Sequence, residues 1–280
     1  MKKAIQILFL FCLMTGGCLS VAFGQNAPQP VTTEGTDFWV AFPKIAGTTY
    51  LDKSLTLSFI VISSSATPMQ VVVAYGISDR AMATLTLDAG GSKEYTLTGA
   101  QIENSYLSDS ETPLPRSVHI YAKDGRTPFY CFAYVKAGTA GNTARDATLL
   151  LPERSLGLEY MIQTYPQDGK STGFVVVATQ NQTTVNITPF AKTFQGKPPQ
   201  TTFTQVLNRG HSLWVASCPP NKDKNLVKQD TMDMSGSLIC ADKPVAVYAA
   251  NEDVKIPMSE SLSSDFMMEQ VPPITGFGTE

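Results

Sequence analysis

The chain has 280 residues and a formal net charge of -3; 43% of its residues are hydrophobic and 16% are charged. This length is sufficient for two ordinary domains with cores of their own, and the hydrophobic content excludes an intrinsically disordered chain. Because the net charge is negative and the lysines and arginines are scattered, a basic nucleic-acid-binding surface is also excluded.

Residues 1–24 have the pattern of a secretory signal peptide, with two lysines followed by an apolar run over 4–14. That run is too short to span a membrane, and no later apolar run is long enough for a transmembrane segment. Ala22 and Gly24 supply small residues at the two positions that a signal peptidase reads, so we expect cleavage before Gln25 and an exported protein, extracellular or on the outer cell surface. Lipid attachment at Cys18 is the alternative, because the preceding residues resemble a lipobox.

Beyond a linker at residues 25–34, almost every apolar segment has strand character. Residues 55–59 and 84–87 alternate apolar and polar side chains, which is typical of half-buried strands. The β-branched run at 174–177 indicates a central strand, and glycine-containing turns separate such segments. No segment predicts a convincing helix. The sequence therefore predicts an all-β fold of antiparallel β-sandwiches.

One phrase occurs twice at a spacing of about 120 residues. Residues 35–43 read Gly-Thr-Asp-Phe-Trp-Val-Ala-Phe-Pro, and residues 157–166 read Gly-Leu-Glu-Tyr-Met-Ile-Gln-Thr-Tyr-Pro. Three further pairs of phrases follow in the same order: 87–92 with 207–212, 117–120 with 237–239, and 146–152 with 265–272. Because one offset serves all four pairs, we predict a tandem pair of sandwich units related by an internal repeat, at 35–156 and 157–280. The alternative is that β-proteins reuse similar strands and turns.

The opening of the same phrase returns at residues 278–280. In the earlier copy at Gly157 the phrase runs on into an apolar strand. We therefore expect residues 278–280 to start a strand that belongs to the fold.

Two long insertions, residues 98–116 and 218–234, occupy equivalent places in the predicted units. Structureless loops of this length are usually functional or disordered. The insertions carry opposite charge, which a diversified binding surface would explain. The candidate binding residues are Glu103, Asp109 and Glu111 in the first insertion and Lys222, Lys224 and Lys228 in the second. The alternative is that both insertions are solvated, mobile loops.

Three cysteines remain after removal of the signal peptide: Cys131, Cys218 and Cys240. Cys131 lies in an apolar run and is expected to be a small buried hydrophobic residue. Cys218 and Cys240 bracket the second insertion, and we expect a disulfide between them that clips its base, which export would permit. The odd number of cysteines leaves other pairings open.

The sequence contains no catalytic motif, phosphate-binding glycine loop or pair of cysteines at metal-binding spacing. His119 and His211 have no neighbouring ligand at zinc spacing, and Asp230 and Asp233 lack the spacing of a calcium loop. We therefore expect no metal, no cofactor and no catalytic activity. A carbohydrate-active enzyme is the alternative, because two carboxylates can be brought together by the fold alone.

Taken together, the phrases at 35–43, 146–160, 235–247 and 269–278 resemble the N-terminal domain family of IgG Fc-binding proteins, over residues 35–280. The resemblance implies a secreted or cell-surface protein that binds a protein or glycoprotein ligand, a host-derived one included. Its mammalian representative is a mucus protein described as binding immunoglobulin Fc, so Fc and mucin-like glycoproteins are the implied ligands. Members tend to have a cysteine where this chain has Ser264. A structural spacer or envelope component without a specific ligand is the rival interpretation.

Overall fold

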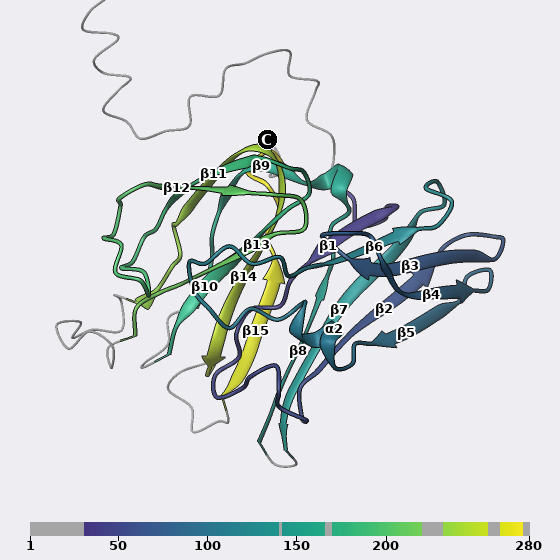
Figure 1. The fold of residues 1–280 in the computed structure, drawn as a ribbon, viewed down its shortest axis with the longest axis horizontal. Helices are drawn as coiled ribbons and strands as arrows, with labels where there is room; N and C mark the ends of the chain where they lie inside the picture. The colour runs from purple at the N-terminus through teal and green to yellow at the C-terminus, as the bar shows by residue number, and fades with distance from the viewer. Residues whose placement is uncertain (1–30, 140–141, 166–169, 220–231, 257–263, 277–280) are drawn as a thin grey trace, which may run out of the picture.

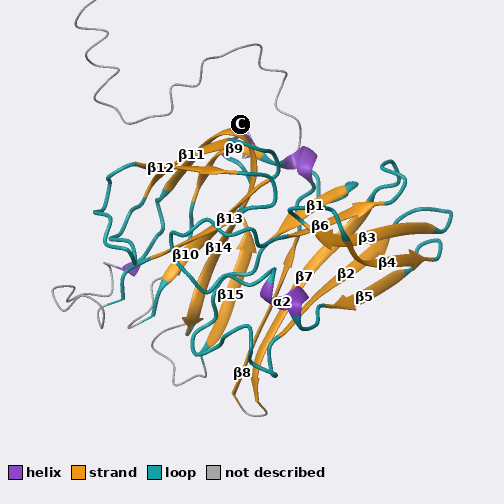
Figure 2. Ribbon diagram, viewed as in Figure 1, coloured by secondary structure: helices purple, strands orange, loops and turns teal. Residues whose placement is uncertain are grey.

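The protein is nearly all β-structure in a computed structural model that describes residues 31–139, 142–165, 170–219, 232–256 and 264–276 (Figures 1 and 2). The pairings between its strands are antiparallel. In the described part of the chain helical structure occurs only as short segments, among them α2 (Ala100–Glu103), η1 (Glu153–Ser155) and η3 (Ile274–Gly276). The predicted all-β, antiparallel fold is therefore confirmed.

The strands that we call the first unit build two four-stranded sheets, in the orders β1-β6-β3-β4 and β5-β2-β7-β8. Strand β2 shows why the segment folds in this way, because Leu57, Phe59 and Val61 recur at every second position and point into the core. The strands are β1 (Asp37–Val40), β2 (Thr56–Ser63), β3 (Met69–Tyr75), β4 (Ala81–Leu87), β5 (Ser92–Thr96), β6 (Val118–Ala122), β7 (Phe129–Thr139) and β8 (Asn142–Leu149).

The remaining strands, which we call the second unit, are organised by β14, a strand of 17 residues. The part of β14 from Leu238 to Val245 pairs with β9 and β11, and the part from Val245 onward pairs with β10 and β15. The strands are β9 (Gly157–Met161), β10 (Thr172–Ala178), β11 (Thr183–Thr188), β12 (Phe203–Leu207), β13 (Ser212–Ala216), β14 (Leu238–Val254) and β15 (Asp265–Gln270).

The two units have the same strand order if β14 is counted once in each half of its sheet. The order β1-β6-β3-β4 of the first unit then corresponds to β9-β14-β11-β12, and the order β5-β2-β7-β8 corresponds to β13-β10-β14-β15. Strands β6 and β7 of the first unit are two strands where the second unit has one long strand.

The glycine that opens each copy of the repeated phrase lies against a proline of its own unit. A Cβ atom added to Gly35 would lie 2.2 Å from the Cβ atom of Pro152, and one added to Gly157 would lie 2.4 Å from that of Pro273. Real Cβ atoms do not approach so closely, so the proline ring occupies space that only glycine leaves open.

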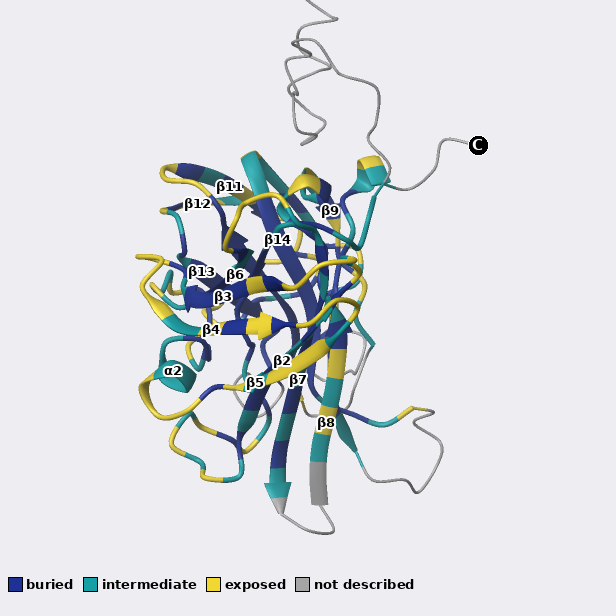
Figure 3. Cartoon of the chain, turned by 90° about the vertical axis from the view of Figure 1, so that its right-hand side faces the viewer, coloured by how far each residue is buried: buried dark blue, intermediate teal, exposed yellow. Residues whose placement is uncertain are grey.

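The second unit packs one face of its sheet against the first unit, with the first unit at the right and the second at the left of Figure 1. Strand β10 is buried at every residue, because Phe174 and Val176 belong to the core of the second unit while Val175 and Val177 join the core of the first. The predicted central strand at 174–177 is confirmed, and its continuous hydrophobic run follows from burial on both faces. In Figure 3 most of β14 is likewise buried.

A seam between β8 and β15 also joins the units through side chains that bond to the backbone of the other strand. The Thr148 hydroxyl accepts a hydrogen bond from the amide of Gln270 at 3.0 Å, and the Gln270 side chain accepts one from the amide of Leu151 at 2.7 Å. The carboxylates of Asp146 and Asp265 accept from backbone amides across the same seam. Two edge strands thus satisfy buried amides without forming a continuous ladder.

Candidate functional site

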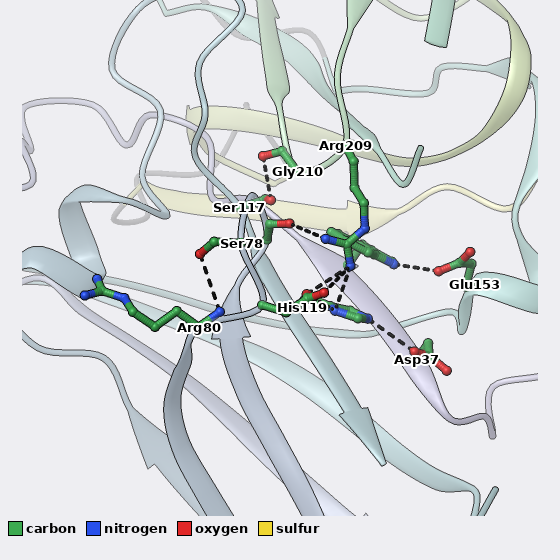
Figure 4. Close-up of polar contacts among 11 residues, drawn as sticks. Asp37, Ser78, Arg80, Ser117, His119, Glu153, Arg209 and Gly210 are labelled. Carbon is green, nitrogen blue, oxygen red and sulfur yellow. Dashed lines mark hydrogen bonds and ion pairs between the residues drawn. The ribbon is translucent and has the colours of Figure 1, made fainter. Parts of the chain in front are cut away.

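A cluster of aromatic and charged side chains lies where the β12–β13 turn of the second unit meets the first unit (Figure 4). Trp39 of β1 stacks on the His119 ring of β6, with 4.0 Å between ring centroids and an interplanar angle of 11°. The guanidinium of Arg209 also lies over the Trp39 indole, with its central carbon 4.6 Å from the ring centroid. The indole nitrogen of Trp39 donates to the carboxylate of Glu153 at 2.8 Å. Trp39 is 1% exposed, so the cluster is an internal junction.

Arg209 is held by both charge and backbone contacts from the first unit. One guanidinium nitrogen donates to both carboxylate oxygens of Asp79 at 2.9 Å, and another donates to the carbonyl of Gly76 at 3.1 Å. The neighbouring Gly210, at φ 73°, leaves no room for a side chain, because an added Cβ would lie 2.3 Å from the Gly76 carbonyl carbon. The Ser117 hydroxyl donates to the Gly210 carbonyl at 2.8 Å.

His119 is bridged by two carboxylates, one on each ring nitrogen. Its Nδ1 lies 2.8 Å from Asp79 and its Nε2 lies 3.2 Å from Asp37. Both ring nitrogens are therefore engaged by carboxylates. A general base needs a ring nitrogen that faces the hydroxyl it would deprotonate, and both nitrogens of His119 face aspartates instead. The arrangement is suited to holding two units together, not to activating a nucleophile.

The charges in this junction lower the pKa of both aspartates. The hydrogen bond from His119 is the main cause that holds the pKa of Asp37 below its ordinary range, with help from the Thr36 hydroxyl and from the charge of Arg209. The pKa of Asp79 is also lowered, because the contacts from Arg209 and His119 together outweigh desolvation, the largest single effect, which acts in the opposite direction.

The first predicted binding insertion is ordered and pairs in part with the second unit. Glu103 lies in α2 and is half-buried, and Asp109 is exposed. Ser110 and Leu114 form bridges to β13, at Trp214 and Ser212. The insertion therefore covers the edge of β13 that would otherwise lie open.

Glu111 corrects the prediction that this insertion presents three acidic residues to a ligand. Its side chain is 2% exposed, and one carboxylate oxygen accepts a hydrogen bond from the amide of Gln195 at 2.7 Å. The ammonium of Lys197 lies 3.7 Å from the other oxygen. A carboxylate buried between the units in this way has no surface to offer a ligand.

The second predicted insertion is largely outside the described residues, and Lys222, Lys224 and Lys228 lie there. So do the predicted cleavage site before Gln25 and the predicted strand at residues 278–280.

The predicted Cys218–Cys240 disulfide is not formed. Cys218 follows β13, is buried and belongs to no disulfide; its thiol lies 3.8 Å from the carbonyl of Pro219. Cys240 lies in the part of β14 that pairs with β9 and β11, whereas β13 pairs with β10 in the other half of the sheet. The two cysteines flank the insertion in the sequence, and that pattern did not reveal that they lie in different halves of the sheet. Cys131 is fully buried as predicted, and burial raises the pKa of its thiol.

A cavity of 280 Å³ lies at the join of the two units, between the loop around Ile45, the end of β7 and the end of β14. Asp52, Glu252 and Asp253 are its acidic lining residues. Burial raises the pKa of Glu252, although the Lys44 ammonium lies 3.5 Å from its carboxylate. Asp253 lies 3.8 Å from the ammonium of Lys170, and Asp52 accepts hydrogen bonds from the amide and hydroxyl of Ser54. Each carboxylate thus has a partner of its own.

The described part of the chain shows neither a metal-binding cluster nor a membrane-spanning helix. It contains no group of three or more histidine, cysteine or acidic residues placed to hold a metal ion. Its helices include none that is long and apolar enough to cross a membrane.

The junction residues Arg209, Asp79 and Glu153 were not predicted from the sequence. Arg209 stands in a glycine-containing turn that the sequence identified only as a turn, and its partner Asp79 is 130 positions away. No local signal marks such a pair, because the fold alone brings the residues together.

No curated protein matches the chain. A family model described as IgGFc binding protein matches residues 146–280, which include the whole of the second unit. Residues 35–145, to which the sequence resemblance also extended, lie outside the matched range. Residues 146–280 of this chain therefore match the IgGFc binding protein family.

Proposed function

We propose that this protein is a secreted or cell-surface module that binds a protein or glycoprotein ligand and catalyses no reaction. The observation that carries the proposal is the family match over residues 146–280, because the family is named for binding and not for a reaction. The His119 junction supports the same conclusion, since its titratable groups are engaged with one another. Immunoglobulin Fc and mucin-like glycoproteins are the ligand classes to test, including those of a host.

The family-matched unit has one sheet face that remains available to a ligand. The face that carries Val175 and Val177 is buried against the first unit, so we assign ligand binding to the outward face of β11 and β12. Val206 on β12 is 52% exposed, and Phe190 just after β11 is 48% exposed. Thr204 and Asn186 lie beside them on this face and are also exposed. Apolar side chains set among neutral polar ones are suited to a protein surface.

We propose that the two insertions also contribute to ligand binding. Glu103 and Asp109 can contribute from the first insertion, and Lys222, Lys224 and Lys228 from the second. Glu111 does not contribute to ligand binding, because it is buried.

Export is proposed on the sequence of residues 1–24, with the mature chain starting at Gln25. Intact-mass measurement of secreted protein tests it. A lipid-modified species that starts at Cys18 would contradict it.

We also infer that the units at 35–156 and 157–280 descend from one duplicated sandwich. The common strand order and the Gly35–Pro152 and Gly157–Pro273 contacts support this inference. A duplicated fold offers two equivalent surfaces that can diverge, which is how the two insertions could acquire opposite charge.

A carbohydrate-active enzyme is the second candidate, and the cavity at the join of the units is the observation that favours it. Glu252, whose pKa is raised by burial, would be the proton donor. The test is hydrolysis of a panel of glycosides by the parent and by Glu252→Gln. No turnover by the parent, or equal turnover by both proteins, would exclude this role for Glu252.

The ligand proposal is tested by biolayer interferometry with the immobilised full chain against IgG Fc, Fab and mucin. The expected result is saturable binding to Fc or mucin that weakens at least tenfold in a Phe190→Glu, Val206→Glu variant. Leu51→Glu is the matched control, since Leu51 is 75% exposed on the first unit. Binding by the parent that survives in the variant would move the site to the insertion, for which Asp109→Lys is the next test. No saturable binding would favour a structural spacer.

A further inference from the structure

The first unit presents an apolar sheet face to solvent on the side away from its core. We use the term outer face for the side chains of Ile60, Ile62, Tyr130, Phe132, Tyr134 and Leu149. They alternate along β2, β7 and β8 with core residues such as Phe59 and Ala133, so they point the other way. All six are partly exposed. A sheet face open to water ordinarily carries polar residues at these positions.

The outer face is continuous across three neighbouring strands. Ile60 pairs with Phe132, which in turn pairs with Leu149. Ile62 pairs with Tyr130 in the same register. Side chains in such cross-strand pairs lie roughly 5 Å apart, so they form one surface and not scattered exposed residues.

The second unit shows what an equivalent face does. By strand order, β2 corresponds to β10 and β7 to the later part of β14. The pair Ile60 and Phe132 then corresponds to Val175 and Tyr248, which are paired in the same way. Val175 and Tyr248 are both 0% exposed, because their face is packed against the first unit.

The face that carries Val175 and Tyr248 packs against β1 of the first unit, and this contact shows which kind of surface such a face binds. The Tyr248 hydroxyl donates a hydrogen bond to the backbone carbonyl of Trp39 on β1. By strand order β1 corresponds to β9, and the place of Trp39 is taken by Met161. Met161 is 51% exposed. Both sides of the internal junction therefore have an uncovered apolar counterpart elsewhere on the molecule.

We propose that the outer face of the first unit binds the β9 side of the second unit of another copy of this chain, so that copies associate head to tail. The contact is heterologous, because different surfaces meet, and it can therefore add further copies in the same direction. This inference goes beyond ligand binding, and its test uses only the protein itself.

The size of the outer face predicts weak association. Eight residues of β2 and three strands give roughly 26 by 14 Å, or about 370 Å² in projection. Stable complexes bury about 800 Å² per partner, so this contact belongs to the weak class. We expect dissociation constants of the order of 10–100 µM, and the measurement must reach protein concentrations near 1 mM.

The test is sedimentation velocity of the full chain from about 10 µM to 1 mM. The parent should show a concentration-dependent increase in weight-average mass. Phe132→Lys should weaken association at least tenfold, and Met161→Lys should do the same from the other side. Leu51→Lys is the control, with a charge at an exposed site outside both surfaces, and it should associate like the parent.

Mixing the two defective variants gives the sharpest outcome. Phe132→Lys retains an intact β9 side and Met161→Lys retains an intact outer face, so an equimolar mixture should form dimers that grow no further. If Phe132→Lys does not fold by circular dichroism, Tyr130→Ser replaces it. A parent that stays monomeric at 1 mM, variants that associate as the parent does, or a mixture that stays monomeric would each overturn the proposal.

Discussion

The guanidinium of Arg209 in the second unit lies over the indole of Trp39 in the first, with 4.6 Å between the guanidinium carbon and the ring centroid. The same guanidinium bonds to Asp79 and to the Gly76 carbonyl, so one side chain combines stacking, charge and backbone recognition. Arginine can meet all three demands because its planar fork is always charged, whereas lysine is a point charge. The relationship makes Arg209 the residue on which the junction most depends.

Replacing Arg209 with alanine should lower the free energy of unfolding by about 1–2 kcal/mol, since the ion pair is partly exposed but the bond to Gly76 is lost as well. Urea unfolding followed by tryptophan fluorescence measures the change. Arg209→Lys should recover only part of it. Arg126→Ala, at an exposed turn, should cost less than about 0.5 kcal/mol. Equal effects of the two alanine substitutions would contradict the assigned role.

Asp37→Asn should reveal the pH dependence of the junction. Because the hydrogen bond from His119 lowers the pKa of Asp37 in the folded state, the stabilisation is present above the unfolded pKa of about 4 and is lost as pH falls through the folded pKa. The stability gap between parent and variant should therefore be full near pH 5.5 and should close toward pH 2. Thermal unfolding at these values measures it. A gap that does not change with pH would show that the charge of Asp37 is irrelevant.

The stability difference between the parent and Glu252→Gln should depend on pH in the opposite sense, and should be largest at high pH. Burial is the main reason why the folded pKa of Glu252 is raised, while Lys44 and Lys170 oppose the shift and Asp253 adds to it. The stability that Glu252 contributes to the fold is present below its unfolded pKa of about 4. It is lost as pH rises through the folded pKa. The variant, which stays neutral, should melt higher than the parent at pH 8 and at the same temperature at pH 4. Glu94→Gln, at an exposed position of β5, is the control for the loss of a surface carboxylate.

Gly35→Ala and Gly157→Ala should each cost about 1–3 kcal/mol, because the new methyl group would overlap a proline ring that is part of the rigid backbone. The comparison is Gly90→Asn, at a left-handed position with open space around it, which asparagine tolerates. Chemical unfolding of the three variants measures the costs. If Gly35→Ala lowered the free energy of unfolding no more than Gly90→Asn does, contact with the proline ring would not explain the repeated glycine.

The sequence predicted the class of fold because its signal is local. Alternation in residues 55–59 and the β-branched run at 174–177 specify strands without reference to the rest of the chain. Burial of β10 on both faces was not predicted, since a continuous apolar strand is equally compatible with an ordinary sandwich core.

The site was less predictable because its contacts are long-range. Glu111 lies in a charged insertion that indicates a solvated loop, yet the edge of β13 and the amide of Gln195 turn it into a buried acceptor. His119 gave no ligand pattern because its two carboxylate partners, Asp37 and Asp79, come from separate strands and turns. Chemical complementarity of this kind exists only once the strands are placed.

The measurement that tests the central claim most directly is a calorimetric titration of the full chain with purified IgG Fc, repeated with a mucin glycoprotein. The account predicts a saturable isotherm with a defined stoichiometry for at least one of them, and none for Fab. Heats indistinguishable from dilution for both ligands, at protein concentrations of about 100 µM, would contradict the assignment of this protein as a binding module for either ligand class.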